Sequence, residues 1–216
     1  MPRTSLIIAA SAAVLAFSGV ASSPARALDL AQASTDMAHA DEGGQFVANL
    51  AARAVEELTT DKLPLNKRIV RFRSMLTEAF DVPLIGRFVM GRYWRLATDA
   101  QRAEYLKLFE DYIVQTYANR FNDFAGAQLQ VIQTRPGRQD GEVISTLEAA
   151  MPGRPAARFD VRMRRVGDAF KIFDVSVEGI SMSVTQRDDF AAVIQRNGGK
   201  VEGLLASLRE RTKAAP

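Results

Sequence analysis

Hydrophobic residues recur every three to four positions through the first half of the chain. This spacing predicts amphipathic helices over residues 41–60, 65–80 and 98–124, with a shorter helix over 84–90. Gly43-Gly44 weakens the start of the first helix, and Pro83 ends the second. Thr98 and Gln101 form a capping-box pattern at the start of the third, which Gly126 ends.

The pattern changes to alternation after Gly126. Residues 128–134, 141–150, 157–165 and 169–177 predict four strands. The third strand alternates most clearly, because Phe159, Val161 and Met163 are separated by charged residues. Short turns join the strands, so we expect one antiparallel sheet that needs a cover on one face.

Helical spacing returns near the C-terminus. Ser183 and Gln186 form a second capping-box pattern, which predicts a helix that continues to Asn197 and is ended by Gly198-Gly199. A last helix follows, with Val201, Leu204 and Leu208 on one face. Helices and strands occupy separate blocks of the chain, and this order predicts the α+β class rather than a parallel doubly wound sheet.

The first 27 residues have the pattern of a secretory signal. Arg3 precedes an apolar stretch over residues 6–20, and Ala25-Arg26-Ala27 has the small-x-small pattern of a signal-peptidase site. The apolar stretch is too short for a typical membrane span. We therefore expect cleavage after Ala27, with residues 28–216 forming a single domain; the alternative is an uncleaved anchor helix.

Composition excludes several kinds of chemistry. The chain has 216 residues with no cysteine and one histidine, so disulfides, thiolate catalysis and multi-histidine metal sites have nothing to build on. No phosphate-binding loop, GxSxG or HExxH motif is present. Basic residues exceed acidic ones by only three, and two arginines of the signal segment account for most of this excess. The charge therefore gives no support for nucleic-acid binding. We expect no catalytic residues, no cofactor and no metal.

Four separated segments resemble one family. They are residues 80–95 (FDVPLIGRFVMGRYWR), 112–120, 173–181 and 190–199, the last containing IQRNGG. Together they are similar to the MlaC family, also called the toluene-tolerance family of periplasmic phospholipid-binding proteins. The resemblance extends from about residue 45 to residue 211, and a hopanoid-associated branch of the family shares the pattern.

The resemblance implies a fold and a role. The fold is an NTF2-like cone, in which helices pack on a twisted four-stranded antiparallel sheet around an apolar cavity. The role is that of a monomeric periplasmic carrier, which takes a phospholipid between an outer-membrane lipoprotein–porin complex and an inner-membrane ABC transporter with an MCE-domain subunit. The hopanoid-associated branch implies the same role for a different lipid.

We expect the cavity between the sheet and the helices after Pro64, with its mouth near residues 83–94. Its helical wall comprises Phe72, Leu76, Leu84, Ile85, Phe88, Phe109, Tyr112 and Ile113. Its sheet wall comprises Phe159, Val161, Met163, Ile172 and Val175. Arg87, Arg92 and Arg95 flank the aromatic run and could meet a lipid phosphate at the mouth.

The sequence allows two alternative functions, and it allows two interpretations of one basic surface. An NTF2-like enzyme could use Asp174 as its base, and an accessory protein could have a solid apolar core in place of a cavity. Arg158, Arg162, Arg164 and Arg165 form a basic stripe, which either steers the protein to an acidic partner or is paired with neighbouring carboxylates.

Overall fold

Helices and strands alternate in blocks along the chain, as the pattern predicts. The computed structural model describes residues 24–59, 63–118, 120, 124–151 and 153–213, and only the backbone of residues 24–33. The helices are α1 Pro24–Leu58, α2 Leu65–Ala79, α3 Val82–Met90, α4 Asp99–Tyr117, α5 Met182–Arg196 and α6 Val201–Lys213, with a 3-10 helix, η1, over Gly91–Arg95. The strands are β1 Gln128–Pro136, β2 Glu142–Ala150, β3 Ala157–Val166, β4 Ala169–Val177 and β5 Ile180–Ser181.

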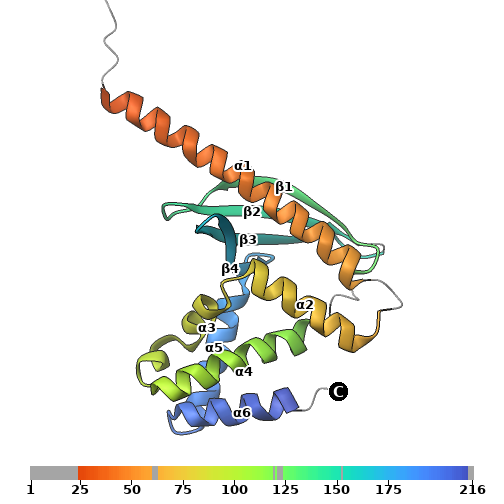
Figure 1. Cartoon of the computed structure of the whole chain (residues 1–216), viewed down its shortest axis with the longest axis vertical. Coiled ribbons are helices and arrows are strands. Elements are labelled where there is room, and N and C mark those ends of the chain that lie inside the picture. Colours follow the sequence, from red (N-terminus) through yellow and green to blue (C-terminus); the bar gives the residue numbers. More distant parts are fainter. Residues whose placement is uncertain (1–23, 60–62, 119, 121–123, 152, 214–216) are drawn as a thin grey trace, which may run out of the picture.

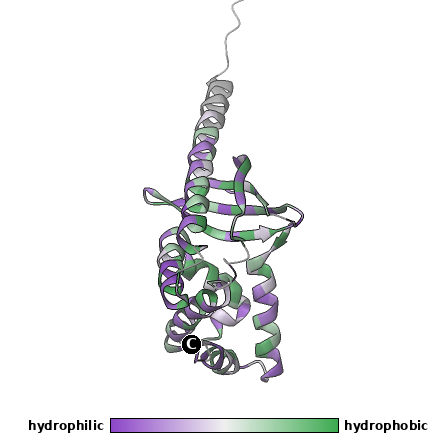
Figure 2. Cartoon of the chain, turned by 90° about the vertical axis from the view of Figure 1, so that its right-hand side faces the viewer, coloured by the Kyte–Doolittle hydropathy of each residue, from purple (hydrophilic) through white to green (hydrophobic). Residues whose placement is uncertain are grey.

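The strands form one antiparallel sheet in the order β1-β2-β3-β4-β5, which confirms the α+β class. The four predicted strands are present, and strands and helices both carry a mixture of apolar and polar residues (Figure 2). The alternation predicted for β3 places Val161 and Met163 in the buried sheet cluster. The sheet has one strand more than predicted, because Ile180 and Ser181 pair with Val177 and Ser176. A register shift between Arg162 and Met163 adds local twist where β3 meets β4.

The long helix α1 runs across β1 and β2 (Figure 1). The prediction of a helix that starts weakly at Gly43-Gly44 is wrong, since both glycines lie well inside α1. A Cβ added at Gly43 would lie 2.7 Å from Val143 Cγ1, and one at Gly44 would lie 2.8 Å from Thr134 Oγ1. The two glycines therefore let the helix backbone approach the sheet more closely than any other residue would allow.

Capping explains where two of the other helices begin. Thr98 and Gln101 form the predicted capping box at the start of α4. The second predicted capping box is wrong, because Ser181 rather than Ser183 caps α5 by accepting a hydrogen bond from the Val184 N–H. The Ser183 hydroxyl is engaged elsewhere, as a donor to Asp174.

Two predicted boundaries differ from the structure or lie outside it. Helix α4 ends at Tyr117, and Phe124 packs beside Phe159 with 6.0 Å between ring centroids instead of continuing the helix. Residues 119 and 121–123 lie outside the described residues, as do residues 1–23 of the predicted signal segment. The predicted cleavage position after Ala27 lies within α1 and stays a prediction. In the part of the chain that the structure describes, no helix has the length and hydrophobicity needed to cross a bilayer.

The buried apolar residues form two clusters. The helical cluster gathers side chains from α2 to α6 and the C-terminal end of α1. The sheet cluster gathers side chains from the middle of α1 and from β2, β3 and β4. Helix α1 contributes to both, through Ala40 and Val47 in the sheet cluster and Leu58 in the helical cluster.

Candidate functional site

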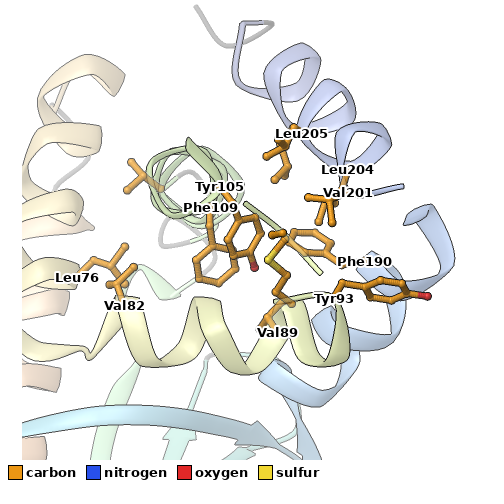
Figure 3. Packing of buried hydrophobic residues seen from close by; sticks show 14 of the residues in the cluster. Leu76, Val82, Val89, Tyr93, Tyr105, Phe109, Phe190, Val201, Leu204 and Leu205 are labelled. Atoms are coloured by element: carbon orange, nitrogen blue, oxygen red, sulfur yellow. The ribbon is translucent and has the colours of Figure 1, made fainter. Parts of the chain in front are cut away.

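The helical cluster is built around three aromatic rings. Tyr105 and Phe109 of α4 stack at 5.7 Å, and both meet Phe190 of α5 edge-on at 6.3 and 6.2 Å (Figure 3). The Tyr105 hydroxyl donates to the Gly86 carbonyl of α3 at 2.9 Å, and burial raises the pKa of that hydroxyl well above its usual range. A Cβ at Gly86 would lie 2.9 Å from Leu106 Cδ2, so this glycine brings α3 against α4.

The predicted helical wall belongs to this cluster for the most part. Phe72, Leu76 and Phe109 are buried in it. The other members that pack against it are partly buried: Ile85, Tyr112 and Ile113. Leu84 is partly exposed, and Phe88 is 43% exposed on the outer side of α3.

The predicted sheet wall belongs to the other cluster. Val161, Met163 and Ile172 are buried in the sheet cluster, and Phe159 and Val175 pack against it. These residues pack with Val47, Phe46 and Leu50 of α1. The two predicted walls thus lie in separate clusters, and the role of their residues as lipid contacts stays a prediction.

Phe80 lies where the two clusters meet. It is partly buried and packs against both clusters. Its backbone forms an isolated bridge with Ile172 of β4, and the Asp81 N–H donates to the Ile172 carbonyl at 2.8 Å. The segment between α2 and α3 therefore joins the helical layer to the sheet through a short stretch of backbone.

A groove opens beside Phe80, between α2, α3 and α4. Its volume is about 410 Å³. Its lining residues are Thr77, Phe80, Val82, Pro83, Leu106, Lys107 and Glu110. Four of these lining residues are apolar, whereas Lys107 and Glu110 bring charge to the lining. The sequence predicts the mouth near residues 83–94 but does not identify Phe80, Val82 and Leu106 as lining residues. The available signal was the position of Phe80 at the end of the apolar stripe of α2, just before α3.

The four arginines of the predicted stripe are all paired with carboxylates. Three distances are 3.7 Å for Arg158–Glu148, 2.6 Å for Arg162–Glu142 and 3.1 Å for Arg164–Asp81. Arg165 pairs with Glu42 of α1. The pairing with neighbouring carboxylates is therefore confirmed, and these ion pairs fasten β3 to β2, α1 and the start of α3. The steering of an acidic partner by this stripe stays a prediction.

Glu142 is the most buried member of these pairs. Its side chain is 2% exposed. Burial alone would raise the pKa of Glu142, but hydrogen bonds from Arg162 and from the backbone N–H groups of Gln139 and Arg138 together lower it below its usual range. The carboxylate thus closes the β1–β2 turn while it holds Arg162.

The three arginines predicted to meet a lipid phosphate are exposed. Arg87 and Arg95 contact no carboxylate in the described residues, and Arg92 donates to the Tyr93 hydroxyl at 2.9 Å. None of the three lines the groove beside Phe80. Their contact with a lipid headgroup stays a prediction.

Asp174 has a structural role in the fold. It is 8% exposed and accepts hydrogen bonds from Ser181 Oγ at 2.7 Å, from the Ser183 N–H at 3.2 Å and from Ser183 Oγ. These bonds fasten β4 to the first turn of α5 and occupy most of the lone pairs of the carboxylate. In the described residues no group of three His, Cys, Asp or Glu side chains could hold a metal ion.

These features define an α+β protein with two apolar layers and a partly apolar groove between α2, α3 and α4, beside the residue Phe80 that contacts both layers. The family model described as MlaC protein matches residues 48–210, well over half of the chain. The chain therefore belongs to the MlaC family, which confirms the resemblance seen in the sequence.

Two similar proteins support this assignment. The toluene tolerance protein ttg2D of Pseudomonas putida is 26% identical over 131 residues, which cover 59% of this chain and 60% of that relative. The phospholipid-binding protein of Ralstonia solanacearum, solved in complex with a phospholipid, has a TM-score of 0.70 at 22% identity. The alignment covers 79% of this chain and 96% of that one, and it shows a shared fold.

Proposed function

We propose that this protein is a periplasmic carrier that binds a phospholipid between its two apolar layers. The observation that carries the proposal is the groove at Phe80, because Phe80 is the one residue of the described part of the chain that packs on both the helical and the sheet cluster. Membership of the MlaC family supports the same function, as does the fold shared with a protein that was solved with a phospholipid bound.

The groove is the place where an acyl chain would enter. Its volume of about 410 Å³ falls within the range of about 300–1,000 Å³ that is common for ligand pockets. The groove is large enough for only part of a phospholipid. To bind a complete phospholipid, Phe80 has to move and the two clusters have to separate at their junction. The buried wall residues of both layers, such as Phe72, Leu76 and Met163, would then line one continuous apolar site.

The free energy of acyl-chain burial explains why such a carrier is needed. Each methylene removed from water is worth about 0.8 kcal/mol, so a segment of about ten methylenes contributes about 8 kcal/mol. A phospholipid therefore does not cross an aqueous compartment unaided. The carrier takes it from one membrane complex and delivers it to another; for this family the complexes are an outer-membrane lipoprotein–porin complex and an inner-membrane ABC transporter with an MCE-domain subunit.

Native mass spectrometry of the purified protein tests the proposal. We expect a population heavier than the chain by the mass of a phospholipid, and fragmentation would identify its headgroup and acyl chains. A hopanoid in place of a phospholipid would assign the chain to the hopanoid-associated branch. A chain that carries no lipid, and takes up none from vesicles, would contradict the proposal.

A pair of tryptophan variants tests the groove itself. Thr77→Trp places a large ring in the groove from an exposed position of α2, so it should lower lipid content without unfolding the protein. Val70→Trp is the matched control, because Val70 is exposed on the same helix two turns away and does not line the groove. Equal lipid content in the two variants would exclude this groove as the acyl-chain site.

A further inference from the structure

One exposed surface combines arginines with apolar side chains. On α3, Leu84, Arg87 and Phe88 follow the i, i+3, i+4 spacing of one helix face. On α5, the Arg187 guanidinium lies over the Phe88 ring at 5.0 Å, and Val184 precedes Arg187 by one turn. We call these five residues the α3–α5 face.

Two of the three apolar members of this face are open to solvent. Phe88 is 43% exposed and Val184 is 37% exposed, although both are large apolar side chains. Phe88 lies about 200° around α3 from Gly86, which packs on α4 beside the groove. Phe88 therefore lies on the other side of α3 from the part that packs on α4, whereas Arg87 follows the groove residue Pro83 by one turn, at the edge of the groove.

The charge of the α3–α5 face is mostly uncompensated. Arg87 has no ion pair in the described part of the chain, and the only carboxylate that Arg187 contacts is its exposed neighbour Asp188, at 3.7 Å. On η1, directly after α3, Arg92 is also exposed and bonds only to a tyrosine hydroxyl. By contrast, all four arginines of β3 are paired with carboxylates.

We propose that the α3–α5 face docks the protein onto the surface of an anionic phospholipid bilayer. Arg87 and Arg187 would meet lipid phosphates, and Phe88 and Val184 would insert among the headgroups. Surfaces that combine basic and apolar residues bind at this interface through apolar burial and through attraction to anionic lipid. A bilayer presents phosphates at every position, so it can satisfy each unpaired arginine without a partner of matching shape.

Co-sedimentation with vesicles tests this proposal. The wild-type chain should bind vesicles of phosphatidylcholine mixed with phosphatidylglycerol more tightly than vesicles of phosphatidylcholine alone. The difference should shrink as salt is raised, because exposed charges are screened within about 8 Å at physiological ionic strength. Arg87→Gln with Arg187→Gln should weaken binding to the mixed vesicles by about 25-fold, from about fivefold for each arginine near an anionic surface.

Helix α2 supplies matched controls. Lys67 and Arg71 are exposed there and flank Val70, which is 67% exposed. The double variant Lys67→Gln with Arg71→Gln removes the same charge and should leave most of the vesicle binding intact. Phe88→Ser should weaken binding more than Val70→Ser does. Equal losses in each matched pair, or no preference of the wild-type chain for anionic vesicles, would overturn the proposal.

A further variant separates the bilayer from the cargo as the source of phosphate. Arg187 belongs to neither predicted wall and to none of the predicted headgroup arginines. Arg187→Gln should therefore weaken vesicle binding about fivefold, while the content of co-purified lipid stays that of the wild type.

Lost lipid content with unchanged vesicle binding would assign Arg187 to the cargo and contradict the bilayer proposal. Loss of binding only to an acidic protein acceptor would assign the face to a protein partner, which contradicts it as well. Vesicle binding needs no bound cargo. A chain that carries no lipid would therefore disprove the proposed carrier function, whereas the vesicle experiment would still decide whether the α3–α5 face docks on a bilayer.

Discussion

The helical cluster and the sheet cluster are held together in different ways. Tyr105, Phe109 and Phe190 interlock at the centre of the helical cluster, and each ring contacts the other two. The sheet cluster consists mainly of aliphatic side chains under α1, and Gly43 brings that helix close to the sheet. Between the two lies Phe80, with an open groove beside it. The comparison predicts that the helical layer resists deformation and that, under the proposed function, a ligand would enter at the junction with the least loss of packing.

Truncation of a central ring of the helical cluster should cause the largest loss in the free energy of unfolding. Phe109→Ala should lower the free energy of unfolding by about 3–5 kcal/mol, because it removes a buried ring and leaves a cavity. Val161→Ala in the sheet cluster should cost about 2 kcal/mol, since it removes far less apolar surface. Denaturant unfolding measures both variants. A larger loss for Val161→Ala would show that the sheet cluster is the more tightly packed layer.

The two close-approach glycines give a matched pair. Gly43→Ala should cost about 1–3 kcal/mol, because its Cβ would meet Val143 Cγ1 at 2.7 Å, on a strand that is fixed on both sides. Gly86→Ala should cost less, since the nearest atom at 2.9 Å, Leu106 Cδ2, is the end of a flexible side chain and the Phe109 ring lies farther away, at 3.1 Å. Thermal unfolding of the two variants would rank them. The reverse order would mean that α1 lifts from the sheet more easily than α3 moves from α4.

Acid should affect the sheet region through Glu142. Its pKa is lowered in the folded state, so the ionised carboxylate stabilises the fold above its unfolded pKa of about 4.5, and this contribution is lost as pH falls through the folded value. Glu142→Gln should cost about 1 kcal/mol at neutral pH. The difference from wild type should shrink below about pH 4.5. A difference that is constant from neutral to acid pH would show that the charge of Glu142 contributes nothing.

Local patterns predict the elements well where the contacts that decide them are also local. The alternation of Phe159, Val161 and Met163 identifies β3, and the Thr98–Gln101 box identifies the start of α4. The capping box predicted from Ser183 and Gln186 does not form, because the Ser183 hydroxyl donates a hydrogen bond to Asp174, nine residues earlier on β4. The local pattern at Gly43 predicts a weak helix start, because the contact that explains this glycine is with Val143, a hundred residues away in the chain.

The candidate site was harder to predict than the elements. Helical and strand spacing identified apolar wall residues such as Phe72 and Met163, and both are buried. Spacing alone could not reveal that these residues lie in separate clusters, because the packing of α1 on the sheet depends on contacts between residues that are far apart in the chain. Nor could it single out Phe80, whose importance comes from its pairing with Ile172 across the two layers.

Photo-crosslinking at Phe80 tests most directly the claim that a phospholipid binds between the two layers. The photoreactive residue benzoylphenylalanine would replace Phe80 in one variant and the exposed Val70 in a control. After irradiation of the lipid-loaded proteins, mass spectrometry should show a phospholipid adduct on the residue at position 80 and none at position 70. An adduct at both positions alike, or none at position 80 in a protein that still carries lipid, would contradict the account.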